Sequence, residues 1–305
     1  QNAFGGHTPF RERETNMATT FDGPIDKQAL DTGALDIRPM TPAIGAEIHS
    51  IDLGASDIAA RIPEIRAALL KYGVVFFRDQ DLTQEQHITF ARAFGELEVH
   101  PATPKDQPNP EVLRIAHGPK SRGQENNWHS DVTWREEPSL GSILMAREVP
   151  ECGGDTCFAN MHLAYERLSE QMKRFCEGLT AVHDIARVFA KRLDKAPADL
   201  HEKYPPMRHP VIRTHPETGE RVVYVNNGFT SHIEGLSKQE SEWVLDQLYK
   251  TAWDVEIQCR FRWQAGSIAF WDNRVCQHLA VSDYFPARRV MERVTIAGDK
   301  PYFTP

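Results

Sequence analysis

The sequence predicts an α+β protein in which antiparallel sheets pack face to face and helices lie outside them. Two observations support this fold class. Segments with helical periodicity cluster at residues 56–95, 160–178 and 237–250, whereas most strand-like segments lie in the second half of the chain. The sequence also contains no internal repeat and no low-complexity tract, so a repeat architecture is not indicated.

The helical segments carry spacing and capping signals. Thr83 and Ser237 are each followed three residues later by Gln or Glu, which predicts a capping box at the start of a helix. Residues 162–178 are expected to form one helix. The first helix should end near Gly73, because apolar residues recur at helical spacing before it: Ile58, Ile62, Ile65 and Leu69.

Alternation of apolar and polar residues predicts the strands. It is clearest over residues 255–263, and residues 74–77 form a short apolar run typical of a buried strand. Residues 101–126 are rich in proline and glycine, and we expect a long functional loop there. Residues 183–208 are polar and are expected to form a solvated insertion.

Composition narrows the class of protein. The 305 residues are 40% hydrophobic and 26% charged, with a net charge of −8, which argues against a nucleic-acid partner. The five cysteines are odd in number and scattered, which fits a reducing, cytoplasmic location. No apolar run predicts a membrane span. We expect residues 1–35 to form an N-terminal arm and residues 36–305 to form a single catalytic domain.

One short motif suggests a metal site. His129 and Asp131 are two residues apart, so in an extended segment their side chains would share a face. With the distant His278 they would supply two imidazoles and one carboxylate. That set suits Fe(II) with coordination positions left open, whereas a structural zinc site more often recruits cysteine.

The segment after His278 adds a pair of cations. Residues 287–296 alternate like a strand, which places Arg289 and Arg293 on one face. Guanidinium groups suit carboxylate, sulfonate or sulfate, so two anion sites beside a metal site are one interpretation. A solvated arginine pair at a sheet edge is the other.

Together these motifs resemble the TauD/TfdA family of Fe(II)/2-oxoglutarate-dependent dioxygenases, and in particular its taurine dioxygenase and alkylsulfatase branch. The likeness extends from about Ile37 to Pro301. Its motifs are His129-x-Asp131, the run from Trp271 to His278, the Asp283-Tyr284 pair, and Arg289-x-x-x-Arg293.

The resemblance implies a double-stranded β-helix, or jelly roll, with flanking helices. It implies Fe(II) bound by His129, Asp131 and His278, with 2-oxoglutarate as cosubstrate and O2 as oxidant. Thr156 and Arg289 would bind 2-oxoglutarate. The products would be succinate, CO2 and a hydroxylated small organic anion. A homodimer or homotetramer is also expected.

The resemblance also suggests residues that contact the substrate. His100 and Arg293 would hold a sulfonate or sulfate group. Thr103 stands where taurine enzymes carry tyrosine, and Glu125 where they carry asparagine, so taurine itself is not favoured. The residues assigned to this pocket are His100, Arg293, Val132, Thr103, Glu125 and Trp134.

Three alternatives remain open on the sequence. An aryloxyalkanoate dioxygenase of the same family would use the same residues on a carboxylate. A zinc hydrolase could use the same three ligands with a bound water, but it would leave the paired arginines unexplained. The third is a cupin-like binding or sensor protein that kept the fold. Such a protein would not need all three of His129, Asp131 and His278, and all three are present.

Overall fold

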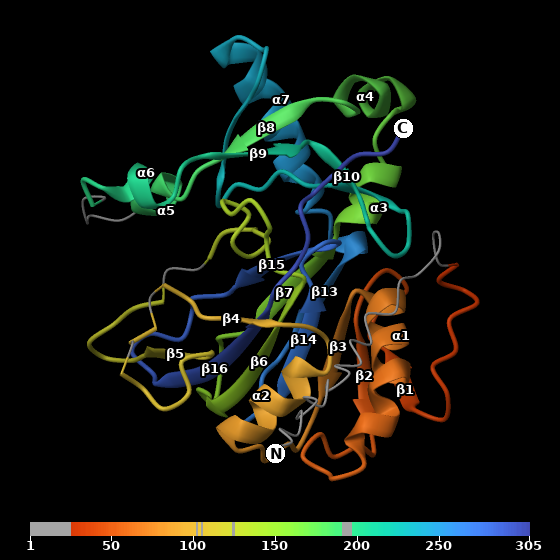
Figure 1. Cartoon of the computed structure of the whole chain (residues 1–305), viewed down its shortest axis with the longest axis vertical. Coiled ribbons are helices and arrows are strands. Elements are labelled where there is room, and N and C mark those ends of the chain that lie inside the picture. Colours follow the sequence, from red (N-terminus) through yellow and green to blue (C-terminus); the bar gives the residue numbers. More distant parts are fainter. Residues whose placement is uncertain (1–25, 102, 105, 124–125, 191–196) are drawn as a thin grey trace, which may run out of the picture.

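A large, mainly antiparallel sheet forms the framework of the computed structural model, which describes residues 26–101, 103–104, 106–123, 126–190 and 197–305. Its strands run in the order β1-β2-β3-β14-β6-β16-β4, with β5 also paired to β16, and only β2 and β3 pair in parallel (Figure 1). Their bounds are β1 Asp36–Pro39, β2 Ala46–His49, β3 Val74–Phe77, β14 Ile268–Asp272, β6 Gly141–Glu148, β16 Arg289–Ile296, β4 Leu97–Glu98 and β5 Val112–His117.

A smaller antiparallel sheet packs on one face of the large one. It consists of β13 (Gln258–Phe261), β7 (Thr156–Asn160) and β15 (Cys276–Ala280). Phe76 of the large sheet stacks on Phe261 with ring centroids 4.0 Å apart and meets Phe158 edge-on at 5.6 Å. These aromatic contacts fix the spacing of the two sheets, and they lie beside the strand that carries His278.

Helices cover the other face of the large sheet. Side chains alternate along β3, so Val74 and Phe76 face the small sheet, whereas Val75 and Phe77 face the helices. The helices there are α1 (Ile62–Tyr72), preceded by a 3₁₀ turn at Ile58–Arg61, and α2 (Gln84–Arg92). The capping boxes predicted at Thr83 and Ser237 are both present.

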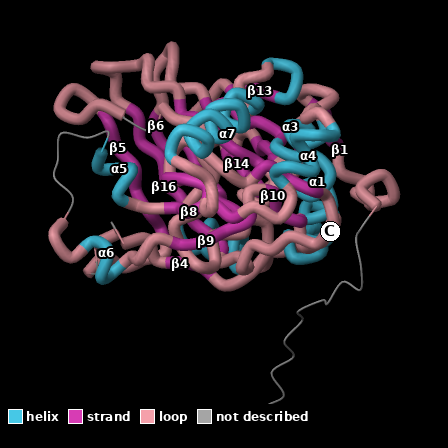
Figure 2. The backbone as a smooth tube through the Cα atoms, turned by 90° about the horizontal axis from the view of Figure 1, so that it is seen from above, coloured by secondary structure: helices cyan, strands magenta, loops and turns pink. Residues whose placement is uncertain are grey.

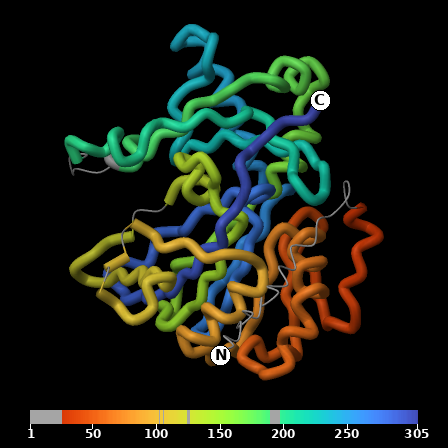
Figure 3. Tube along the Cα trace, viewed as in Figure 1, coloured from red at the N-terminus to blue at the C-terminus, as the bar shows by residue number. Residues whose placement is uncertain are grey.

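A further layer lies beyond the small sheet (Figures 1 and 2). Its sheets pair β12 (Thr230–Ile233) with β8 (Thr180–His183) and β9 (Met207–Pro210), and β10 (Ile212–Thr214) with β11 (Arg221–Val223). Its helices are α3 (Met161–Glu166), α4 (Glu170–Cys176), α5 (Ala186–Ala190), α6 (Leu200–Lys203) and α7 (Lys238–Thr251). The chain after β16 runs along this layer (Figure 3), where the Thr214 amide donates to the Tyr302 carbonyl at 2.7 Å.

Two predicted elements are interrupted. The helix expected over 162–178 is broken into α3 and α4, because Ser169 caps a new helix by accepting from the Met172 amide. The strand expected over 255–263 begins with a 3₁₀ turn, Val255–Ile257, where the Asp254 carboxylate accepts from the Glu256 amide at 2.9 Å. In both places a local side-chain cap prevails over the apolar pattern.

Two segments expected to be irregular contain regular structure. Residues 101–126 include β5, which pairs with β16 from Arg289 to Val294. Residues 183–208 include α5 and α6, and His183 at its start is fully buried. Of the predicted arm, residues 1–25 lie outside the described range. No helix in the part of the chain that the structure describes is long and apolar enough to cross a membrane.

A buried histidine in α2 makes the stability of the fold pH-dependent. Burial, with the nearby charge of Arg147, lowers the pKa of His87 to about 4, while Glu292 acts in the opposite direction. Between pH 6.5 and 4 the unfolded chain therefore binds a proton that the folded chain does not, so stability falls as the pH falls through this window. We expect the wild type to lose about 2 kcal/mol more than His87→Leu between pH 7 and pH 5. Urea unfolding at both pH values measures this, and equal losses would contradict it.

Candidate active site

Two histidines far apart in sequence are joined by a backbone bridge. The His129 amide donates to the His278 carbonyl at 3.1 Å, and the His278 amide donates back to the His129 carbonyl at 2.8 Å. Strand β15 supplies His278, and the bridge pairs the edge of β15 opposite β7 with the loop that carries His129. The imidazole centroids are consequently only 4.3 Å apart.

Asp131 reaches the same place from a turn. The prediction that His129 and Asp131 share one extended segment is wrong beyond His129, because the chain turns at Asp131 and Val132 has a φ of +46°. Two contacts hold the turn, one from the Asp131 amide to Asn273 Oδ1 at 3.2 Å and one from the Ser142 hydroxyl to Asp131 Oδ2 at 2.8 Å. The other carboxylate oxygen, Oδ1, faces the imidazoles.

The three side chains fit a metal ion. Asp131 Oδ1 lies 3.7 Å from His129 Nε2 and 3.9 Å from His278 Nε2, and the three ligand atoms lie within 4.8 Å of one another. His129 Nδ1 is 2.7 Å from the Asn127 carbonyl, so it carries the proton and leaves the Nε2 lone pair available. Two imidazoles and one carboxylate suit Fe(II). Among the described residues, no other group of three or more His, Cys, Asp and Glu side chains brings its ligand atoms this close together.

The charges around the site keep these ligands in metal-binding form. Burial opposes ionisation of Asp131, but Arg293, the two imidazoles and the Ser142 hydroxyl outweigh it and hold the pKa of this carboxyl below its ordinary value. Burial, with the neighbouring His129 and Arg293, lowers the pKa of His278 to about 3. An ionised carboxylate and a neutral imidazole are the states that bind metal.

Of the two predicted substrate-anion residues, Arg293 contacts a metal ligand. Arg293 Nη1 donates to Asp131 Oδ1 at 3.0 Å. Burial, with the positive charges of Arg293 and Arg135, lowers the pKa of His100 to about 4. Thr103 is buried, and its amide donates to the His100 carbonyl at 2.8 Å.

The predicted 2-oxoglutarate residues form a second cluster. Thr156 Oγ1 accepts from Trp263 Nε1 at 3.0 Å. The Arg289 guanidinium carbon lies 5.9 Å from the Trp263 ring and 5.7 Å from the Tyr284 ring. Gly154 has a φ of +73°, and a Cβ at this position would lie 3.1 Å from Arg289 Cδ, so glycine permits this close approach. A guanidinium beside a hydroxyl between aromatic walls is suited to a carboxylate.

The remaining predicted pocket residues have different outcomes. Val132 is buried within the turn after Asp131. Trp134 is also buried, and its ring meets Tyr204 edge-on at 5.0 Å. Glu125 lies outside the described residues. The structure therefore brings Arg293 to the metal ligands, and it brings Thr156 and Arg289 to the same indole ring, that of Trp263.

Several residues that support the site were not predicted from the sequence. Ser142 binds Asp131, and Glu98 forms an ion pair with Arg135 close enough for the Asp131 and Arg293 charges to affect Glu98. Nothing in the spacing of these residues connects them, because β4 and β6 are brought together only by pairing with β16. Asn273 lies within the run from Trp271 to His278 that contributes to the family resemblance. It binds the Asp131 amide directly.

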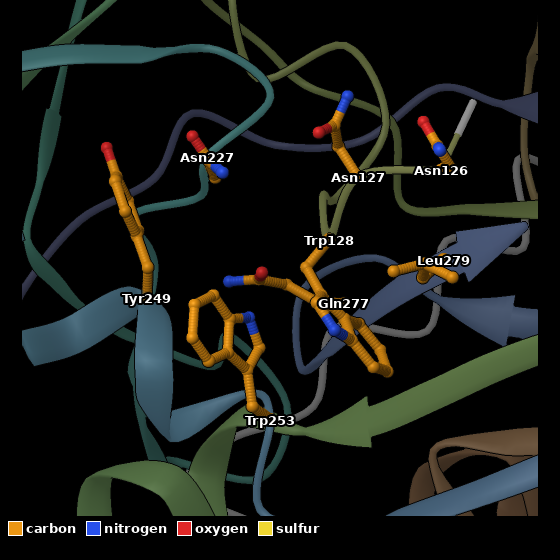
Figure 4. A pocket seen from close by; sticks show the side chains of 8 residues that line it. All are labelled: Asn126, Asn127, Trp128, Asn227, Tyr249, Trp253, Gln277 and Leu279. Atoms are coloured by element: carbon orange, nitrogen blue, oxygen red, sulfur yellow. The ribbon is translucent and has the colours of Figure 1, made fainter. Parts of the chain in front are cut away.

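A separate hollow of about 400 Å³ opens on the other side of β15 (Figure 4). Gln277 and Leu279 line it, and they flank His278 along the strand, so they point away from the metal ligands. The other lining residues are Asn126, Asn127, Trp128, Asn227, Tyr249 and Trp253. It contains none of the predicted site residues.

Comparison with known proteins decides the family. The model of the "Taurine catabolism dioxygenase TauD, TfdA family" matches residues 36–295. The chain belongs to this family. It is 36% identical over 276 residues to the alpha-ketoglutarate-dependent sulfate ester dioxygenase of Pseudomonas putida, covering 88% of this chain and 91% of that protein.

Further members of the TauD/TfdA family resemble the chain over most of its length. The alkylsulfatase of Acinetobacter baylyi is 35% identical over 280 residues, covering 88% of this chain and 86% of that protein. A crystal structure of a taurine dioxygenase from Burkholderia xenovorans is 40% identical with a TM-score of 0.77, covering 89% of this chain and 92% of that one.

Removing any one ligand should destroy the metal site. We expect His129→Ala, Asp131→Ala and His278→Ala each to weaken Fe(II) binding by at least about 100-fold, because two ligands cannot hold the ion on an open face. Anaerobic calorimetry measures the affinity, and circular dichroism verifies folding. His232→Ala, at an exposed histidine, is the matched control. An Asp131→Ala protein with wild-type affinity would contradict the ligand assignment.

Proposed function

We propose that this chain is an Fe(II)- and 2-oxoglutarate-dependent dioxygenase that hydroxylates an alkyl or aryl sulfate ester or sulfonate. The observation that carries the proposal is the contact of Arg293 with the Asp131 carboxylate, with a second guanidinium, Arg289, in a separate aromatic cluster. We assign Arg289 to the cosubstrate and Arg293 to the substrate. The sulfate ester dioxygenase and alkylsulfatase relatives support the substrate class.

We also propose that the two facing sheets form a jelly roll and that residues 36–305 act as one catalytic domain. The packing of Phe76 against Phe158 and Phe261 joins the sheets, and the His129–His278 bridge lies at the middle of β15. A cytoplasmic location fits five cysteines that are all unpaired. A homodimer or homotetramer belongs to the same proposal.

When bound, Fe(II) and 2-oxoglutarate would supply the activation of O2, with succinate and CO2 released and one oxygen atom transferred to the substrate. His129, Asp131 and His278 would hold the iron. Arg289 and Thr156 would bind the distal carboxylate of 2-oxoglutarate, while the Trp263 and Tyr284 rings exclude water and strengthen that ion pair. Arg293 would fix the sulfur anion, and neutral His100 would contribute one N–H donor.

Hydroxylation is expected at the carbon next to the heteroatom. For a sulfate ester this carbon would then carry both the new hydroxyl and the ester oxygen. The C–O bond to sulfate breaks as the hydroxyl loses its proton, and the products are an aldehyde and sulfate. A tetrahedral anion held by Arg293 and His100 would leave the alkyl chain to run toward Thr103, which is shorter than the tyrosine of taurine enzymes and should give a deeper pocket.

The two arginines should have separable effects. We expect Arg289→Ala to raise mainly the KM for 2-oxoglutarate and Arg293→Ala mainly the KM for the organic anion. Loss of a desolvated charge pair should cost about 2–5 kcal/mol. Steady-state kinetics with each substrate varied in turn measures the split. Swapped effects would reverse the assignment of the two anion sites.

The substrate class is tested by specificity constants. We expect hexyl sulfate and a longer alkanesulfonate to exceed taurine, because the pocket next to Thr103 should suit an apolar chain. Succinate release at saturating 2-oxoglutarate is the measurement. A tenfold preference for taurine would contradict this prediction, and turnover confined to aryloxy carboxylates would support the aryloxyalkanoate alternative.

A further inference from the structure

The two oxygens of Asp131 have different surroundings. Oδ2 accepts from the Ser142 hydroxyl at 2.8 Å. Oδ1 accepts from Arg293 Nη1 at 3.0 Å, and it is the same oxygen that faces the Nε2 atoms of His129 and His278 at 3.7 and 3.9 Å. The arginine and a divalent metal ion would therefore act on one oxygen atom.

Arg293 is well placed to affect that oxygen strongly. Its side chain is 13% exposed and that of Asp131 is 6% exposed, so solvent screens their attraction poorly. Strand β16 holds Arg293 between Leu113 of β5 and Leu144 of β6, so its backbone is fixed on both sides. Its Nε is buried without a hydrogen-bond partner within the described residues, which leaves a donor for a second anion.

We propose that Arg293 is shared between Asp131 and the substrate anion, and that this sharing couples metal binding to substrate binding. While Arg293 lies on Oδ1, its positive charge opposes a divalent ion at the two imidazoles. A sulfate or sulfonate on Arg293 neutralises that charge and leaves Oδ1 to the metal. The relief of this repulsion by a bound anion rests on the proposed substrate class. The repulsion itself does not.

Charge determines the sign of the coupling between metal binding and anion binding. A cation about 3 Å from a ligand oxygen repels a second cation at that oxygen, and a bound anion offsets the repulsion. Because coupling between two binding sites is reciprocal, the anion must strengthen metal binding by the same factor that the metal strengthens anion binding. If Arg293 only held Asp131 in position, removal of Arg293 would instead weaken metal binding.

The metal arm of the test needs no substrate. Isothermal calorimetry with Co(II) is carried out on the full chain for the wild type, Arg293→Gln and Arg288→Gln. Arg288 is the matched control, because its exposed guanidinium pairs with Glu148 at 2.7 Å away from the metal ligands. We expect Arg293→Gln to bind Co(II) at least about 10-fold more tightly than wild type and Arg288→Gln to match wild type. Equal or weaker binding by a folded Arg293→Gln protein overturns the inference.

The anion arm repeats the titrations with saturating hexyl sulfate and, as an uncharged control, hexanol. We expect hexyl sulfate to strengthen Co(II) binding by the wild type about 10-fold and to leave Arg293→Gln unchanged, while hexanol affects neither protein. If hexyl sulfate is turned over by the iron enzyme yet leaves the wild-type Co(II) affinity unchanged, the inference is overturned. If hexyl sulfate is not turned over, the proposed substrate class fails, and the metal arm alone decides whether Arg293 opposes the metal.

Discussion

The active site depends on the pair of hydrogen bonds between the backbones of His129 and His278. One histidine lies in a loop after residue 126 and the other in a strand of the small sheet, almost 150 positions later. A backbone bridge fixes the relative position of two side chains more firmly than side-chain contacts alone, because neither end can rotate independently. With the two backbones fixed, the side-chain rotamers alone determine whether the imidazoles point toward Asp131.

The surrounding core holds this bridge in place. Trp271 lies 4.8 Å from the His278 ring and donates its indole N–H to Asn273, which also binds the Asp131 amide. Next to it, buried Asp272 pairs with Arg274 and His215, and these charges hold the pKa of Asp272 far below its ordinary value against the effect of burial. Buried ion pairs of this kind contribute geometry more than net stability. Here they fix the turn between β14 and β15.

Much of the site could be predicted because its chemistry restricts residue types. His129, Asp131 and His278 are recognisable as a ligand set from the sequence alone, and the alternation over residues 287–296 correctly predicted a strand, β16. The family model matches residues 36–295, which include these motifs.

The unpredicted parts depend on contacts between distant segments. Residues 112–117 look like loop until β16 pairs with them, and Ser142 gains its role only when β6 brings it to Asp131. The break before α4 had a local signal in Ser169, but the apolar positions on either side favoured one continuous helix. Periodicity reports which residues are apolar, whereas caps and strand partners decide where an element begins and ends.

We propose that His129, Asp131 and His278 bind one Fe(II) whose open face accepts 2-oxoglutarate. The most direct test is an anaerobic titration of the protein with Fe(II) at saturating 2-oxoglutarate, followed by visible absorption. We expect a weak metal-to-ligand band that saturates at one iron per chain and does not form with Zn(II). Stoichiometric iron binding without this band would contradict the claim.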